Sequence, residues 1–247
     1  MPKLADAIRR TQRVESAPMG FGAARNAAPP SMLVGALVDA SGVAAAASAG
    51  ADVVLLNVSG ALTPDAVKKA RDAAPDAVIG ATGSVADSEA AAALKNAGLD
   101  FLIVTDSTPA AALLEDDLGY ALDLPNQPEE LFLRSLGPMS FEALYLAETP
   151  SPLTVAGQIG LSRIAALAGK PLLTRAPGNA SKDDLRCLRS VGVAGVITDV
   201  AGVAALKETV KSLPPRRGKR EDRTVVSLPH GAVGGHEHDD DDDDDDD

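Results

Sequence analysis

The sequence predicts a single (β/α)8, or TIM, barrel of the α/β class, and two observations lead to this fold. Residues 170–203 contain an apolar run, a Gly-Asn turn, a capped helical pattern and a second apolar run. Strand, helix and strand in about thirty residues is the size of one parallel βαβ unit. The rest of residues 31–213 repeats this unit until eight apolar runs are each followed by a helical pattern. Eight units are the count of a closed barrel, whereas open doubly wound sheets usually have fewer strands.

The expected strands are short apolar runs with little alternation, as parallel strands buried on both faces should be. They cover 32–38, 52–58, 77–81, 100–104, 120–124, 141–146, 171–174 and 194–198. The helical patterns between them cover 41–49, 63–73, 86–97, 108–117, 127–135, 157–168, 182–191 and 201–212. Thr63 before Pro64, and Ser181 three residues before Asp184, are typical helix starts. The fourth and fifth units are weakly patterned, so an open or incomplete barrel is the alternative.

Both ends of the chain are expected to lie outside the barrel. Residues 1–30 form an N-terminal extension in which Leu4 and Ile8, with arginines between the apolar positions, predict a short amphipathic helix. We expect this helix to cover the bottom of the barrel; an organellar presequence is the alternative, and Asp6 counts against it. Residues 214–247 predict a disordered acidic tail, because they contain few apolar residues and end in a run of aspartates at 239–247.

Composition limits the partners. The net charge is -12, but nine of these charges belong to the terminal aspartates, so the rest of the chain is near neutral and has no basic face for nucleic acid. Aromatic residues make up 2%, which also argues against base stacking. No apolar run reaches the roughly 18 residues of a membrane span, so a soluble protein without a membrane partner is expected. The single cysteine, Cys187, excludes an internal disulfide and favours a cytoplasmic location.

The candidate site follows from the barrel, because such folds place their sites at the carboxyl ends of the strands. The first polar residue after each run is Asp39, Asn57, Thr82, Asp106, Asp123, Glu148, Arg175 and Asp199. The carboxylates Asp39, Asp106, Asp123, Glu148 and Asp199 are candidate catalytic acids and bases, and Asp39 and Asp199 are candidate ligands of Mg²⁺ or a similar hard cation. Asn57, Thr82 and Arg175 are candidate substrate-binding residues, with Arg175 suited to an anionic group. The alternative is that these residues only form turns where strands meet water.

Histidine usage excludes several reaction types. All three histidines, His230, His236 and His238, lie in the tail, so the barrel has no imidazole. Ser-His-Asp catalysis and histidine-ligated zinc are therefore excluded from the barrel. The lysines lie on expected helices or before strands, which argues against a Schiff-base lysine.

The loop after the seventh run, Gly178-Asn179-Ala180-Ser181, resembles the corresponding loop of phosphate-binding barrels, the broad group that includes flavin-dependent and sugar-phosphate enzymes. The resemblance implies that Gly178, Asn179 and Ser181 hold a phosphate group through free backbone N–H groups, and it implies FMN as a further cofactor. The chain departs from this pattern, because Asp183 and Asp184 occupy the first helical turn and repel phosphate.

We therefore expect an enzyme of the lyase or isomerase type that acts on a small anionic metabolite. Two alternatives remain: a non-catalytic scaffold whose tail binds a basic partner or divalent cations, and an oxidoreductase that binds FMN or phosphate. A homodimer is expected only by analogy with other barrels of this size.

Overall fold

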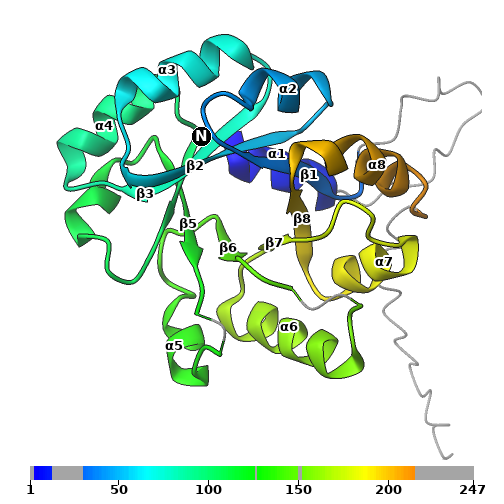
Figure 1. The fold of residues 1–247 in the computed structure, drawn as a ribbon. Helices are drawn as coiled ribbons and strands as arrows, with labels where there is room; N and C mark the ends of the chain where they lie inside the picture. Colours follow the sequence, from blue (N-terminus) through cyan, green and yellow to red (C-terminus); the bar gives the residue numbers. More distant parts are fainter. Residues whose placement is uncertain (1–2, 13–29, 126, 150–151, 215–247) are drawn as a thin grey trace, which may run out of the picture. The chain divides into compact units, whose positions relative to one another are not determined.

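The structure is a computed structural model that describes residues 3–12, 30–125, 127–149 and 152–214 (Figure 1). Eight parallel strands form a closed barrel in sequence order, and pairing between β1 and β8 completes the ring. The strands are β1 (Leu33–Val38), β2 (Val53–Ala61), β3 (Val78–Ser84), β4 (Phe101–Val104), β5 (Gly119–Asp123), β6 (Ala143–Leu146), β7 (Leu172–Arg175) and β8 (Val193–Thr198). The predicted fold class is confirmed, and the alternative of an open barrel is wrong.

Helices follow the strands and cover the outside of the barrel (Figure 1). They are α2 (Val43–Ser48), α3 (Pro64–Ala73), α4 (Ser88–Asn96), the 3-10 helix η1 (Ala110–Leu114), α5 (Glu130–Ser135), α6 (Val155–Ala168), α7 (Lys182–Ser190) and α8 (Val200–Lys211). In the described residues, no helix is both long and apolar enough to span a bilayer. Residues 13–29 and 215–247 lie outside the described residues, so the predicted tail stays a prediction.

Two predicted helices are shorter than expected. The helix expected over 108–117 is the five-residue 3-10 helix η1, and the helix expected over 127–135 begins only at Glu130. The segment after η1 contains Asp116 and Asp117, whose low helix propensity opposes a longer helix. Pro128 disfavours helical backbone at the residue before it, which delays the start of α5.

The barrel interior is packed with side chains and forms no pore. A cluster of inward-facing residues, among them Leu55, Phe101 and Ile103, fills it, and a second, larger cluster lies between the strands and the helices. The ring of Phe101 lies against Gly80 on the adjacent strand, where a Cβ atom would come within 2.1 Å of the ring. Only a glycine at this position leaves room for a buried phenylalanine in the centre of the barrel.

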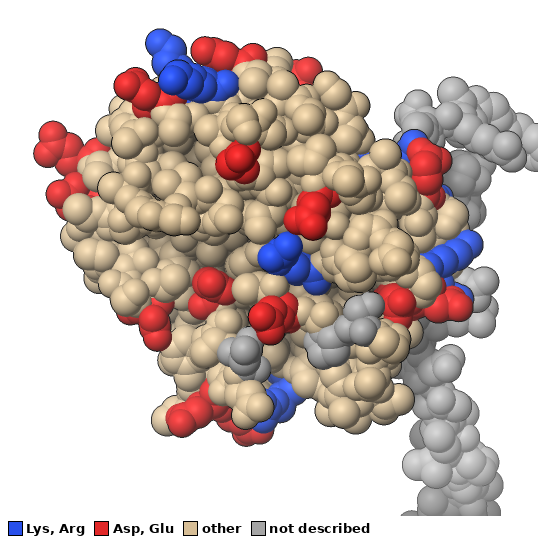
Figure 2. Space-filling model, viewed as in Figure 1, with Lys and Arg blue, Asp and Glu red and all other residues tan. Residues whose placement is uncertain are grey.

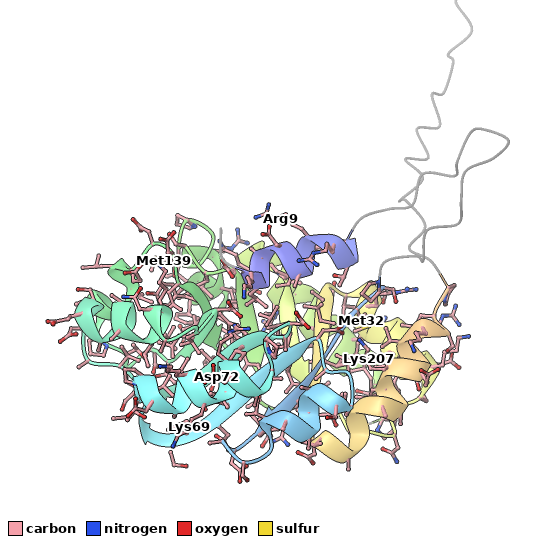
Figure 3. All side chains as sticks on the ribbon, turned by 90° about the horizontal axis from the view of Figure 1, so that it is seen from above. Arg9, Met32, Lys69, Asp72, Met139 and Lys207 are labelled. Atoms are coloured by element: carbon pink, nitrogen blue, oxygen red, sulfur yellow. The ribbon has the colours of Figure 1, made fainter. Side chains whose placement is uncertain are left out.

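The predicted N-terminal helix is present as α1 (Lys3–Gln12). Its residues Leu4 and Ile8 are buried in the inner cluster together with Leu33 and Val53, which begin β1 and β2. Figure 3 shows α1 lying across one end of the barrel. Because its partners are the first residues of strands, α1 closes the amino-terminal end, and the carboxyl ends of the strands remain open on the opposite face.

Candidate functional site

Three polar side chains enter the open end of the barrel from the neighbouring strands β5, β6 and β7. Asp123 is the last residue of β5, and its Cα pairs with that of Tyr145 on β6. Tyr145 pairs with Leu173 on β7, and Arg175 follows Leu173 by two residues. Alternate residues of a strand face the same side, so Asp123, Tyr145 and Arg175 all face the barrel axis. We call these three residues the mouth triad.

Burial and charge change the acidity of the mouth triad. Burial raises the pKa of the Asp123 carboxyl above its usual value. Burial is also the main reason why the pKa of Tyr145 is raised; the charge of Arg175 opposes this effect and that of Asp123 adds to it. The three groups therefore interact electrostatically. A carboxyl whose pKa moves towards neutrality is better suited to proton transfer than one with an ordinary pKa.

Arg175 forms an ion pair with Asp199, the residue between β8 and α8. Its Nη2 atom lies 3.4 Å from Oδ1 of Asp199, and the two side chains are 42% and 81% exposed. Exposed ion pairs of this kind contribute at most about 1 kcal/mol. An anionic ligand can therefore displace Asp199 from the guanidinium at little cost in free energy.

The other predicted residues lie around the same end of the barrel but have different surroundings. Asn57 and Thr82 are partners on β2 and β3, and the Thr82 hydroxyl is 3.4 Å from Oδ1 of Asn57 and 3.3 Å from the Leu56 carbonyl oxygen. Asp106 and Glu148 are exposed in the loops after β4 and β6. Figure 2, drawn from the side opposite α1, shows acidic side chains around this face with basic side chains beside them.

Asp39 forms a turn, which was the alternative to a catalytic role in the sequence analysis. Its Oδ1 accepts hydrogen bonds from the Ser41 hydroxyl (2.7 Å) and from the backbone N–H groups of Ser41 (3.1 Å) and Gly42 (3.0 Å). The bond from the Ser41 hydroxyl contributes most to holding the pKa of Asp39 below its usual value. The carboxylate thus fixes the turn between β1 and α2.

The loop between β7 and α7 packs tightly against the start of α8. A Cβ atom on Gly178 would lie 2.4 Å from the Cα of Gly202, so glycine is needed on both sides of this contact. The Ser181 hydroxyl accepts a hydrogen bond from the Asp184 N–H (3.1 Å) and donates one to Asp184 Oδ2 (2.8 Å). Ser181 is therefore the N-cap of α7, as its sequence pattern indicated, while Asn179 is exposed in the loop.

The acidic residues at the mouth do not form a metal-binding cluster. Asp39 is hydrogen-bonded to its own turn, and Asp199 pairs with Arg175. Within the part of the chain that the structure describes, no group of three or more histidine, cysteine, aspartate or glutamate residues could hold a metal ion. This donor set does not fit a resident Mg²⁺ ion, which needs several oxygen ligands in octahedral geometry.

Tyr145 is the member of the mouth triad that the sequence analysis missed. It lies inside the apolar run 141–146, which the sequence analysis assigned to a strand without singling out any residue, and in the structure Tyr145 is only 4% exposed. One signal was available in the sequence, because the chain has only two tyrosines. In the structure, Tyr145 lies two residues after Ala143 on β6, and both belong to the inner cluster.

These features define the chain as a (β/α)8-barrel protein with a polar, charged mouth. No protein-family model matches it, and no curated protein was found to be similar to it. Solved structures are similar in fold. KGPDC from Streptococcus mutans superposes with a TM-score of 0.59 at 15% identity, covering 73% of this chain and 97% of the other.

Two further barrels are similar to the same extent. Phosphoribosyl anthranilate isomerase from Thermus thermophilus has a TM-score of 0.53 at 13% identity and covers 74% of this chain and 100% of its own. A mutant tryptophan synthase alpha-subunit from Pyrococcus furiosus has a TM-score of 0.55 at 15% identity, with coverages of 74% and 98%. At such low identities these similarities establish the fold alone.

Proposed function

We propose that the protein is an enzyme of the lyase or isomerase type that acts on a small anionic metabolite at the mouth of the barrel. The observation that carries this proposal is the mouth triad. It combines two protic groups of raised pKa with a guanidinium whose present partner is exposed. A guanidinium recognises carboxylate or phosphate groups, and the two protic groups are suited to moving protons on the bound molecule.

The roles of the triad follow from the chemistry of its members. Arg175 binds the anionic group of the substrate after Asp199 has moved aside. The Asp123 carboxylate takes a proton from a carbon next to a carbonyl group, and the electron pair of that C–H bond forms an enolate. The Tyr145 hydroxyl donates a hydrogen bond to the enolate oxygen, where the negative charge develops. Where the same carbon carries a hydroxyl group, the proton of that hydroxyl passes to the enolate oxygen, and return of the abstracted proton to the former carbonyl carbon leaves the carbonyl group on the first carbon, which completes an isomerisation. Protonation of an enolate that is left by C–C cleavage completes a lyase reaction.

The similar structures support this class of reaction by analogy only. One of them is named as an isomerase. Because one barrel fold hosts many unrelated reactions, the analogy adds little to the argument from the site. The contact between Gly178 and Gly202 brings the β7–α7 loop to the amino end of α8, which is compatible with an anionic group near Arg175.

Proton exchange tests the proposal without knowledge of the substrate. Phosphorylated sugars and oxo acids are incubated with the protein in D2O, and NMR records which C–H signals disappear. We expect Asp123→Asn to slow this exchange by at least about a hundredfold while the ligand still binds. Arg175→Met should weaken binding roughly tenfold to a hundredfold, because a charge-assisted hydrogen bond is lost. Arg163→Met on α6, which removes an exposed arginine paired with Glu130, is the matched control.

Two results would contradict the proposal. One is that Asp123→Asn exchanges protons as fast as the wild type, and the other is that Arg175→Met and Arg163→Met bind the ligand equally well. A chain that binds none of these anions would favour the scaffold instead. Copurification of a yellow chromophore would favour the FMN-binding oxidoreductase.

A further inference from the structure

We infer that Glu142 makes the docking of helix α1 pH-sensitive, so that α1 closes the amino-terminal end of the barrel more tightly when this carboxyl carries a proton than when the proton is lost. The inference concerns the end of the barrel opposite the mouth triad and does not depend on the proposed reaction.

The side chain of Glu142 is partly buried beneath α1. Glu142 directly precedes β6, and its backbone N–H donates to the Tyr120 carbonyl oxygen at 2.8 Å. Its Oε2 atom is buried, and no described residue donates a hydrogen bond to it. A Cβ atom added to Gly119 on β5 would lie 2.6 Å from this oxygen, so the carboxyl fills the space above a glycine. A charged oxygen held in this way has lost its water without gaining a donor, which is costly.

Helix α1 supplies the cover. Leu4 and Ile8 are 0% and 3% exposed and belong to the inner core, so α1 cannot leave without exposing apolar surface. The backbone N–H of Ala5, in the first turn of α1, faces the Glu142 carboxyl and favours its charged form. Docking of α1 therefore has two opposite effects on this group: it removes water from the carboxyl and offers it one donor.

The charged groups around Glu142 are largely engaged with other partners. On α1, Lys3 Nζ lies 3.3 Å from Asp100, and Arg9 lies 3.6 Å from Asp6. Asp100 is also paired with Arg71 of α3. On the β7 side, Lys170 Nζ donates to the Met139 carbonyl oxygen at 2.7 Å. The positive charge of Arg9 stabilises the ionised form of Glu142, and the negative charge of Asp6 opposes it.

The balance of these effects favours the neutral carboxyl. Burial, the largest effect, raises the pKa of Glu142 from 4.5 to about 7 in spite of Ala5 and Arg9. When α1 is released, water reaches the carboxyl and its pKa returns towards the ordinary value. The docked state therefore binds the proton more tightly, and a rise in pH through this range shifts the equilibrium towards release. The equilibrium therefore responds to pH between about 4.5 and about 7, most steeply near the middle of this range, and levels off at higher pH.

Hydrogen exchange of the full chain measures this equilibrium directly. Backbone amides of residues 3–12 are followed by mass spectrometry between pH 5.5 and 8.5, with intrinsic exchange rates corrected for pH. In the wild type we expect protection of α1 to fall by about thirtyfold over this range, as linkage requires for pKa values of about 7 and 4.5. In Glu142→Gln, which keeps the shape but cannot ionise, protection should stay constant.

Two control variants separate titration from a general loss of docking. Lys3→Met removes the ion pair to Asp100, so it should lower protection by a similar factor at every pH. Glu89→Gln, on the exposed face of α4, should leave the wild-type profile unchanged. If Glu142→Gln does not fold, the carboxyl is titrated in the wild type by carbon-13 NMR, where a midpoint near 7 is expected. Protection of wild-type α1 that does not depend on pH, an unchanged slope in Glu142→Gln, or a midpoint near 4.5 would each overturn the inference.

Discussion

At the scale of single residues, packing in the centre of the barrel depends on the close contact between Gly80 and Phe101. The ring of Phe101 is 1% exposed and lies where a Cβ atom of residue 80 would be. Gly80→Ala must therefore displace the ring inside a closed core, and we expect it to lower the free energy of unfolding by about 3 kcal/mol. Denaturant unfolding measures this loss.

A second glycine provides the control for this prediction. Gly160 lies within α6, and a Cβ atom there would meet nothing within 4 Å. Gly160→Ala should raise the free energy of unfolding by about 1 kcal/mol, because alanine has the higher helix propensity. Equal effects of the two substitutions would show that Phe101 does not need the space at Gly80.

The same scale shows how far the sequence predicted the site. Asp123, Arg175 and Asp199 were found because they are the first polar residues after a strand, and strand ends meet at one face of a barrel. The level at which their side chains face the barrel axis could not be predicted, because it depends on the register between neighbouring strands. Asp39 satisfied the same sequence rule, yet its hydrogen bonds stabilise a local turn. A short polar side chain at a strand end can belong to a binding site or can stabilise a turn, and only the three-dimensional structure distinguishes the two roles.

At the scale of elements, α1 owes its stability to packing, because a ten-residue helix is marginal by itself. Leu4 is completely buried in the inner core. We expect Leu4→Ala to lower the free energy of unfolding by about 3 kcal/mol, from the lost apolar burial and the cavity that remains. Leu131→Ala on α5 is the matched control, since Leu131 is 79% exposed and should change stability by less than about 0.5 kcal/mol. If Leu4→Ala left the free energy of unfolding unchanged, α1 would not close the barrel in solution.

The elements also show where sequence patterns fail. The strands were predicted from their continuous apolar runs, and α1 was predicted from the spacing of its apolar residues Leu4 and Ile8. The connection between β4 and β5 was predicted as a helix over 108–117, but only η1 forms there. A single turn suffices because Tyr120 on β5 donates a hydrogen bond from its hydroxyl to the Ala112 carbonyl oxygen at 2.8 Å and so ties η1 to the barrel. Contacts between distant elements of this kind are not visible in a local pattern.

At the scale of the whole molecule, the two ends of the barrel differ in the residues that they carry. The carboxyl ends of the strands hold polar groups in loops, and the amino ends are closed by α1 and its apolar residues. Two partly buried carboxyls are divided between these ends, with Asp123 at the mouth and Glu142 beneath α1. Both have pKa values raised by burial, so both make the folded state less stable as pH rises.

Because burial raises the pKa of both carboxyls, the stability of the whole fold should fall as pH rises. A carboxyl whose pKa is higher in the folded than in the unfolded chain stabilises the fold fully below its unfolded pKa, and this stability is lost as pH rises through the folded pKa. For Glu142, with a pKa of about 7 against 4.5, the free energy of unfolding should fall by about 2 kcal/mol between pH 5.5 and 8.5. Asp123 adds to this fall, so Glu142→Gln should reduce the slope without removing it. Urea unfolding of both proteins at several pH values measures the two slopes, and parallel slopes would show that Glu142 titrates at its ordinary pKa in the folded protein.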